Sequence, residues 1–207
     1  MKILFSIIAL TTTATFSLLS FGGSDERKID EKVEESIAEA VEEGLPSAVE
    51  QIPRLDLSGQ DLSTIESVGG LSGLEDLNLS GNQIEDLGPL RGLKKLVVLD
   101  LSNNRITNLI PLRGLQKLQF LNLGHNQIKS LDPLLALPEL KGLVLTGNND
   151  LEFEVLKSMS NLQFLFLTPG PNLSQQEVDS IKKALPDCTV TLVSVSNRMS
   201  ACGGSMA

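Results

Sequence analysis

Side chains that could carry covalent or metal chemistry are scarce in this chain of 207 residues. His125 is the sole histidine, and Cys188 and Cys202 are the two cysteines. A nucleophilic hydroxyl or thiol needs an adjacent base, and neither cysteine stands in register with His125. A zinc site needs a cluster of His and Cys ligands, which the sequence lacks. The sequence therefore indicates no catalytic residue, no metal site and no cofactor.

Four asparagines recur at a fixed spacing of 22 residues, each closing the pattern Leu-x-x-Leu-x-Leu-x-x-Asn. They are Asn82, Asn104, Asn126 and Asn148. A side-chain amide both donates and accepts, so a buried Asn can satisfy backbone groups that lose their partners where a strand ends. We interpret this Asn column as structural. Gln60, at the same position of the first turn, is a longer amide and predicts a looser start to the column.

The spacing predicts a solenoid in which each turn is one strand plus a return segment. Six strands are expected, because the register extends from Ile52 to Leu167. About seven aliphatic side chains per turn point inward, and their burial is the main driving force for folding. The return segments repeat these residues: Ile84, Leu87, Pro89, Leu90, Leu93; Ile106, Leu109, Pro111, Leu112, Leu115; Ile128, Leu131, Pro133, Leu134, Leu137.

This pattern, over residues 52 to 168, resembles the 22-residue leucine-rich repeats of the bacterial internalins and of the leucine-rich regulatory subunit of protein phosphatase 1. The resemblance implies an α/β fold: a right-handed solenoid with a parallel concave sheet, short convex helical turns and a helical cap at each end. Proteins of this group mostly bind other proteins. A shared fold does not carry a shared partner.

The repeats occupy residues 52–170, and the N-terminal 51 residues divide into two segments. Residues 1–22 hold a single charge, Lys2, before an uncharged run, which predicts a secretory signal peptide; an uncleaved membrane anchor is the alternative. Residues 23–51 are acidic, with apolar residues every fourth position from Ile29 to Val41, and predict an amphipathic cap helix. Its carboxylates either form a solvated face or attract a basic partner.

The C-terminal segment, residues 171–195, predicts a second cap made of a helix and a strand. Ser174 and Glu177 form a capping box, and Val178, Ile181, Ala184 and Leu185 form a stripe expected to be buried. A strand from Cys188 to Val195 follows, with Cys188, Val190 and Leu192 on one side. Residues 196–207 are expected to be disordered, so Cys202 either bridges to Cys188 or stays a free thiol.

Strand residues alternate faces, so three columns of side chains are expected on the concave sheet. The columns read, from the N-terminus: Arg54, Asp76, Val98, Phe120, Gly142, Phe164; Asp56, Asn78, Asp100, Asn122, Val144, Phe166; and Ser58, Ser80, Ser102, Gly124, Thr146, Thr168. The N-terminal half of this surface is polar and acidic, and the C-terminal half is apolar.

The apolar half suggests a partner site, because contiguous exposed apolar surface usually marks an interface. We expect this patch to comprise Val98, Phe120, Val144, Phe164 and Phe166, with Asp56, Asp76 and Asp100 as its polar rim. Gly142 would leave a notch between Phe120 and Phe164. The alternative is that the last strand or the tail folds back and covers Phe164 and Phe166.

Other functions find less support in the sequence. His125 occupies a turn position that Gly59, Gly81, Asn103 and Gly147 fill elsewhere, which favours a surface turn residue over a base. Asp56 and Asp100 would lie two strands apart, about 10 Å, too far for joint acid–base work or for one calcium ion. With a formal net charge of −9, nucleic acid is a poor partner.

We therefore predict a non-catalytic protein-binding module, secreted or periplasmic, that presents its concave face to a protein partner. A membrane association is expected only if the signal segment stays uncleaved, and the oligomeric state is open, since an apolar concave face could also bury itself in a homodimer. The rival interpretations are a structural cell-envelope protein without a specific partner and, if the N-terminus is not an export signal, a cytoplasmic phosphatase-regulatory-type repeat protein.

Overall fold

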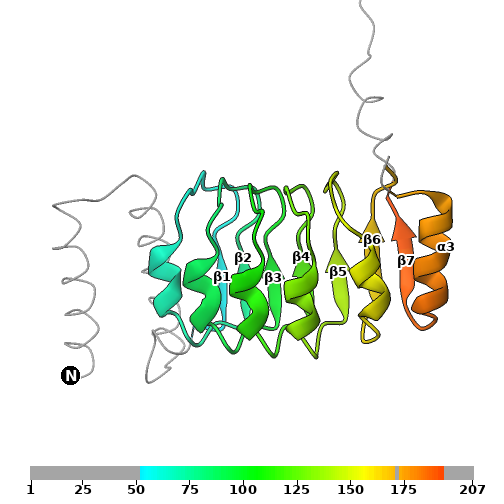
Figure 1. Cartoon of the computed structure of the whole chain (residues 1–207). Helices are drawn as coiled ribbons and strands as arrows, with labels where there is room; N and C mark the ends of the chain where they lie inside the picture. Colours follow the sequence, from blue (N-terminus) through cyan, green and yellow to red (C-terminus); the bar gives the residue numbers. More distant parts are fainter. Residues whose placement is uncertain (1–51, 171–172, 194–207) are drawn as a thin grey trace, which may run out of the picture.

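The structure, a computed structural model, describes residues 52–170 and 173–193 (Figure 1). The predicted signal peptide at 1–22, the acidic helix at 23–51 and the tail at 196–207 lie outside the described residues. So does Cys202, and with it the question of a bridge to Cys188. No helix in the described part of the chain has the length and apolar character needed to cross a bilayer.

The described residues form an open, fully parallel sheet of seven strands that follow one another in sequence order. Each strand pairs with the next at an offset of 22 residues through β5, so that Asp76 lies opposite Val98 and Val98 opposite Phe120. This confirms the repeat period. The strands are β1 (Arg54–Asp56), β2 (Asp76–Asn78), β3 (Val98–Asp100), β4 (Phe120–Asn122), β5 (Gly142–Val144), β6 (Phe164–Leu167) and β7 (Thr189–Leu192).

Short 3-10 helices form the return side of each turn and stack on one another, on the side of the core opposite the sheet (Figure 1). Three of them carry Pro in their first turn, where a missing N–H costs nothing. The helical turns expected from the resemblance are thus present as 3-10 helices. They are η2 (Glu66–Gly70), η3 (Gly88–Gly92), η4 (Ile110–Gly114), η5 (Asp132–Ala136) and η6 (Glu154–Ser158).

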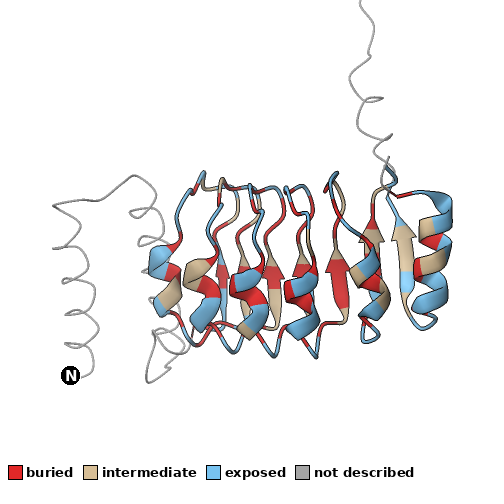
Figure 2. Cartoon of the chain, viewed as in Figure 1, coloured by how far each residue is buried: buried red, intermediate tan, exposed pale blue. Residues whose placement is uncertain are grey.

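A single apolar core runs the length of the stack between the sheet and the 3-10 helices (Figure 2). In the second repeat, seven aliphatic side chains have an exposure of 1% or less, as the repeat pattern predicted. They are Leu74, Leu77, Leu79, Ile84, Leu87, Leu90 and Leu93. Since each turn buries its apolar side chains against the next, removing one turn would expose its neighbours.

The Asn column forms a continuous hydrogen-bonded ladder at the ends of the strands. In the second of its four members, Asn104 Oδ1 accepts from the N–H of Ile84 (3.0 Å), and Nδ2 donates to the carbonyls of Leu79 (2.9 Å) and Leu101 (3.1 Å). The carbonyl of Leu101 also accepts from Asn126. Adjacent asparagines therefore share an acceptor, and their buried amides pair with backbone groups of neighbouring repeats. At the first turn, Gln60 Nε2 donates to the backbone carbonyl of Ser58, two residues earlier in the chain.

The turn beside the Asn column requires a left-handed backbone. Gly59, Gly81 and Gly147 have φ of 62°, 69° and 74°, and Asn103 and His125 have φ of 55° and 56°. Glycine adopts such angles without strain, and Asn or His tolerates them better than most residues. His125 thus occupies the turn position that the sequence assigned to it.

Helix α3 (Gln175–Ala184) follows the last repeat and leads into β7, which pairs with β6. Ser174 accepts a hydrogen bond from the N–H of Glu177, and Val178 and Ile181 are buried in the core. One expectation was wrong, because Ala184 is exposed. In β7, Leu192 is 37% exposed. Leu192 lies on the outermost strand of the sheet, where no further described strand packs beside it.

Candidate functional site

The outer face of the sheet, on the side away from the core, carries the side chains that the repeat pattern assigned to it. Val98, Phe120, Gly142 and Phe164 lie opposite one another on β3 to β6, and Val144 lies opposite Phe166. Phe120 and Phe164 are each 44% exposed, a high value for a large apolar side chain. The structure therefore brings all five predicted patch residues together on four neighbouring strands.

Gly142, between the two exposed phenylalanines, does not leave an empty notch as expected. A Cβ placed on Gly142 would lie 2.5 Å from Cδ1 of Phe120 and 3.0 Å from Cε1. The ring of Phe120 therefore lies against the backbone of β5, and Gly142 is buried beneath it. The absence of a side chain at 142 determines where the Phe120 ring can lie.

A shallow groove of about 220 Å³ runs over these strands. Its walls are apolar side chains and strand backbone, and its polar members come from β3 and β4. It is lined by Val98, Leu99, Asp100, Phe120, Leu121, Asn122, Gly142, Leu143, Val144, Phe164 and Phe166. All five predicted patch residues and one predicted rim residue, Asp100, thus line the same groove.

The last strand lies beside the groove and does not cover it. In β7, Thr189 pairs opposite Phe164 and Thr191 opposite Phe166. Phe164 keeps its 44% exposure in the presence of β7. The alternative in which the last strand folds over Phe164 and Phe166 is therefore wrong, and the alternative involving residues 196–207 lies outside the described residues.

The N-terminal half of the outer sheet face is polar, with three carboxylates. Arg54 Nε lies 3.8 Å from Oδ2 of Asp76, in an exposed ion pair of the kind that contributes little to stability. Asp56 Oδ1 accepts from the N–H of Ser58 (2.9 Å). Because Asp100 is the only one of the three that lines the groove, Asp56 and Asp76 lie farther out along the sheet.

Asp100 is held in place by three hydrogen bonds. Its Oδ1 accepts from the N–H of Ser102 (2.8 Å) and from Ser102 Oγ (2.7 Å), and its Oδ2 accepts from Nδ2 of Asn122 (2.9 Å). The carboxylate is therefore turned toward β4, away from Asp56 on β1. This arrangement fixes a negative charge at the edge of the groove.

Sequence reasoning missed a structural role shared by the four Asp and Asn residues of the second column. Asp56, Asn78, Asp100 and Asn122 each accept, through Oδ1, the backbone N–H of the residue two positions on. Such Asx turns cap the ends of the strands. The signal was present in the sequence as Asp or Asn followed two residues later by Ser or Gly in four successive repeats.

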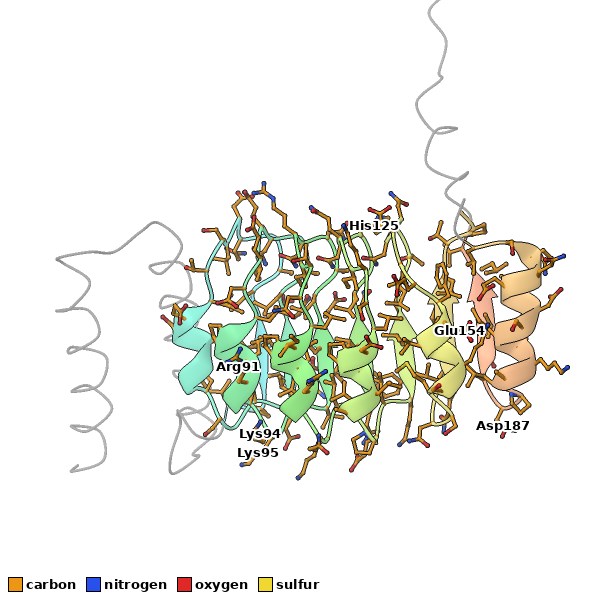
Figure 3. All side chains as sticks on the ribbon, in the orientation of Figure 1. Arg91, Lys94, Lys95, His125, Glu154 and Asp187 are labelled. Carbon is orange, nitrogen blue, oxygen red and sulfur yellow. The ribbon has the colours of Figure 1, made fainter. Side chains whose placement is uncertain are left out.

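The groups considered for catalysis are not brought together. His125 lies on the turn edge of the stack (Figure 3), and its ring lies next to Gly147. Cys188 is partly buried, and this burial raises the pKa of its thiol above the ordinary value, which makes it a poorer nucleophile. No group of three or more His, Cys, Asp or Glu side chains within the described residues is placed to hold a metal ion.

The family comparison identifies the repeats. A family model described as leucine-rich repeats in two copies matches three overlapping stretches, residues 72–116, 94–136 and 116–158. No curated protein matches the chain in sequence. Leucine-rich repeat domains generally act as non-catalytic modules that bind other proteins.

Solved structures share the fold over most of this chain. An internalin (inlF) from Listeria monocytogenes has a TM-score of 0.57 at 23% identity and covers 77% of this chain, which in turn spans 54% of it. An internalin C2 from the same bacterium has a TM-score of 0.55 at 26% identity; the match covers 78% of this chain and 86% of that protein. A leucine-rich repeat protein of Leptospira interrogans has a TM-score of 0.54 at 28% identity, and the match covers 70% of this chain and 44% of that protein. The chain thus spans about half the length of the first of these proteins.

Proposed function

This chain is a leucine-rich repeat protein with an internalin-like fold, and on that premise we propose that it is a non-catalytic module that binds a protein partner through the outer face of its sheet. The observation that carries this proposal is the groove on β3 to β6, where Phe120 and Phe164 are each 44% exposed. Phe120 on β4 and Phe164 on β6 lie on either side of Gly142, and both leave apolar surface in contact with water. Burial against a partner would remove this surface from water.

The groove limits what the partner presents. Its volume of about 220 Å³ accommodates one or two large apolar side chains, so the contact segment carries an aliphatic or aromatic anchor. Asp100 lines the N-terminal side of the groove, and Asp76 and Asp56 lie farther out along the sheet, with Arg54 as the cation beside them. A basic residue beside the apolar anchor would complement this charge. Thr189 and Thr191 bound the site on the other side without charge.

The hydrogen bonds of Asp100 support recognition at this place. Its oxygens are already oriented by hydrogen bonds from Ser102 and Asn122. A partner cation that binds this carboxylate therefore loses little free energy to the ordering of its side chain. The backbone below the neighbouring apolar patch is held by the parallel pairing of β3 to β6. The proposed site is therefore built on strands of the sheet and not on loops.

We also propose that the chain is exported. The proposal rests on Lys2 followed by the uncharged stretch from residue 3 to residue 21, a pattern typical of secretory signals. Determining the N-terminal residue of the protein recovered from cells tests it. An N-terminus near Gly23 in an extracytoplasmic fraction supports export with cleavage. An intact Met1 in the cytoplasm overturns it and favours the phosphatase-regulatory interpretation.

A photo-crosslinking amino acid placed at residue 120 tests the binding proposal. With the full chain expressed in its own cells, irradiation is expected to join residue 120 to one defined protein, and the same label at Leu135, on the helical side, is expected to leave that protein unlinked. Crosslinks to a second copy of the chain would show a homodimer instead. Equal labelling of the same proteins from both positions would contradict the proposal.

A further inference from the structure

The middle of the solenoid is basic, although the whole chain is acidic. Residues 87–131 contain seven Lys and Arg side chains and one carboxylate, Asp100. The formal net charge of the full chain is −9, so the carboxylates are concentrated elsewhere. The excess of positive charge is therefore local to the middle repeats.

Five of these cations gather on η3, η4 and the loops that follow them, which we call the basic patch. They are Arg91, Lys94, Lys95, Arg113 and Lys117. Arg91 and Arg113 occupy the same position of consecutive 3-10 helices, and Lys95 and Lys117 the same position of the following loops. Because η3 and η4 pack directly on each other, the equivalent cations lie one repeat apart. Figure 3 shows Arg91 on η3 and Lys94 and Lys95 in the loop beneath it.

Lys94 links the two repeats of the patch. Its Nζ donates to the carbonyl of Gly114 (3.2 Å), the residue directly after Arg113. The ammonium group is thereby held beside the guanidinium-bearing turn of the next repeat. A backbone carbonyl carries only a partial charge, so this contact does not pair Lys94 with an opposite formal charge.

The cations of the basic patch lie close to few carboxylates in the part of the chain that the structure describes, although Asp132 and Glu139 occupy the positions of Ile110 and Lys117 one repeat on. None of its five side chains forms an ion pair with a described carboxylate, and each residue is exposed. Lys157 occupies the same repeat position as Arg91 and Arg113 and lies two repeats after Arg113. Unlike them, it forms ion pairs with Glu154 (2.5 Å) and Glu177 (3.3 Å). The same register position is thus paired at one end of the stack and unpaired in its middle.

Two exposed aliphatic side chains adjoin these cations. Ile110 begins η4, the helix that carries Arg113, and is 51% exposed. Leu135, on η5, occupies the position of Arg91 and Arg113 one repeat further and is 52% exposed. These are the two most exposed large apolar side chains among the described residues. The 3-10 helices η4 and η5 are anchored in the core by Leu112 and Leu134. The fold therefore does not require Ile110 and Leu135 to be buried.

We propose that the basic patch, with Ile110 and Leu135, binds the anionic surface of a lipid bilayer. Cations on a protein surface are attracted to negatively charged headgroups, and short apolar side chains among them reach the headgroup boundary. The site lies on the helical side of the stack and is separate from the outer sheet face. The inference therefore does not rest on the proposed protein-binding function, and the two sites can be occupied together.

The two aliphatic residues distinguish a bilayer from a soluble polyanion. A hydrophilic polyanion such as a nucleic acid would be held by the five cations alone, and Ile110 and Leu135 would remain in water at the rim. A bilayer takes up both kinds of side chain at once. The basic patch and the two aliphatic side chains lie on three consecutive 3-10 helices, η3 to η5, and the loops that follow η3 and η4, so one flat surface can meet them together.

Co-sedimentation of the full chain with vesicles tests the proposal. Vesicles of phosphatidylcholine alone are compared with vesicles in which one third is phosphatidylglycerol. The parent is expected to bind the anionic vesicles at least about tenfold more tightly, because each cation near such a surface contributes attraction, and salt is expected to weaken this binding. Binding through the apolar run at residues 3–21 would occur on both vesicle compositions and would lower this ratio, so each variant is compared with the parent chain of the same length.

Two variants separate the contributions. The triple variant R91Q/K95Q/R113Q is expected to lose the preference for anionic vesicles, whereas the charge-matched control R105Q/K182Q/K183Q keeps it. The double variant I110S/L135S is expected to reduce binding to anionic vesicles several-fold while leaving binding to soluble poly-glutamate unchanged. All of these residues are exposed, and circular dichroism checks that each variant is folded.

Three results would overturn the proposal. One is equal binding of the parent to both vesicle compositions. Another is the same loss of preference in the control variant as in the patch variant, which would show that net charge alone matters. The third is binding to poly-glutamate through the patch together with full vesicle binding by I110S/L135S, which would assign the patch to a soluble acidic partner.

Discussion

Phe120 lies with its ring against the backbone of Gly142, one strand away on the outer face of the sheet. A Cβ at residue 142 would lie 2.5 Å from Cδ1 of that ring, so the position of the ring depends on glycine in the next repeat. This relationship shapes the groove, because the ring occupies the space that a side chain on β5 would otherwise fill. The apolar surface between Phe120 and Phe164 is continuous for this reason.

Gly142→Ala is expected to show energetic coupling with Phe120. In a Phe120→Ser background, the substitution should stabilise the protein by about 0.4 to 1 kcal/mol, because Ala loses less chain entropy on folding and the backbone angle at 142 is ordinary. In the parent, the displaced ring should offset that gain. Urea unfolding of the four proteins of the double-mutant cycle measures the coupling. Identical effects of Gly142→Ala in both backgrounds would show that the ring does not lie against Gly142.

Asn104→Ala is expected to destabilise the fold by about 1 to 3 kcal/mol. The cost falls mainly on the N–H of Ile84, which loses Oδ1 of Asn104 as its acceptor in a buried place. The carbonyls of Leu79 and Leu101 lose less, because each still accepts from a neighbouring asparagine. Chemical denaturation measures the change.

Asn108→Ala is the matched control for the asparagine ladder. Asn108 also accepts a backbone N–H, that of Ile110, but does so at an exposed position where water can replace it. Its replacement is expected to cost less than about 0.5 kcal/mol. Equal losses at residues 104 and 108 would contradict the role of burial in the ladder.

Lys157 is expected to make stability depend on pH in the alkaline range. Its hydrogen bond to Glu154, together with that to Glu177, raises the pKa of the ammonium above its ordinary value of 10.5, against a smaller opposing effect of desolvation. A raised pKa in the folded state adds stability below the unfolded pKa, and that contribution is lost as the pH rises through the folded pKa. The difference in unfolding free energy between the parent and Lys157→Gln should therefore be constant from neutral pH to about pH 10 and shrink above it.

The control for this titration is Lys182→Gln, on the exposed side of α3. It removes the same charge from the same end of the molecule without breaking the link between η6 and α3. Its difference from the parent should stay flat over the range in which that of Lys157→Gln shrinks. A difference for Lys157→Gln that does not change with pH would mean that the ion pairs on Lys157 do not stabilise the docking of α3.

The backbone of this protein could be predicted closely from its sequence because one pattern recurs. Leu77, Leu99 and Leu121 occupy identical positions, so a single assignment of inward and outward residues serves every turn. The Asn column followed from the same argument, since only a group that donates and accepts satisfies the backbone there. The five apolar patch residues were found by reading the outward positions down the stack.

Other features depend on side-chain packing that the period does not encode. The direction of the Phe120 ring is set by the missing side chain at 142, and the notch expected there is filled. The position of β7 beside β6 follows from α3 docking on the last repeat, which the sequence pattern left open. The basic patch escaped notice because Arg91, Lys95, Arg113 and Lys117 are close only when consecutive repeats are compared position by position.

The central claim is that the groove on the outer sheet face binds a protein partner. The most direct measurement is the affinity of the full chain for the protein crosslinked at residue 120, compared with that of the variant F120S/F164S/F166S, once both show equal circular dichroism. Removal of buried aromatic anchors at an interface commonly costs 2 kcal/mol or more, so an affinity loss of about 30-fold or greater is predicted. An unchanged affinity in the folded variant would contradict the claim and leave the groove without a role in binding.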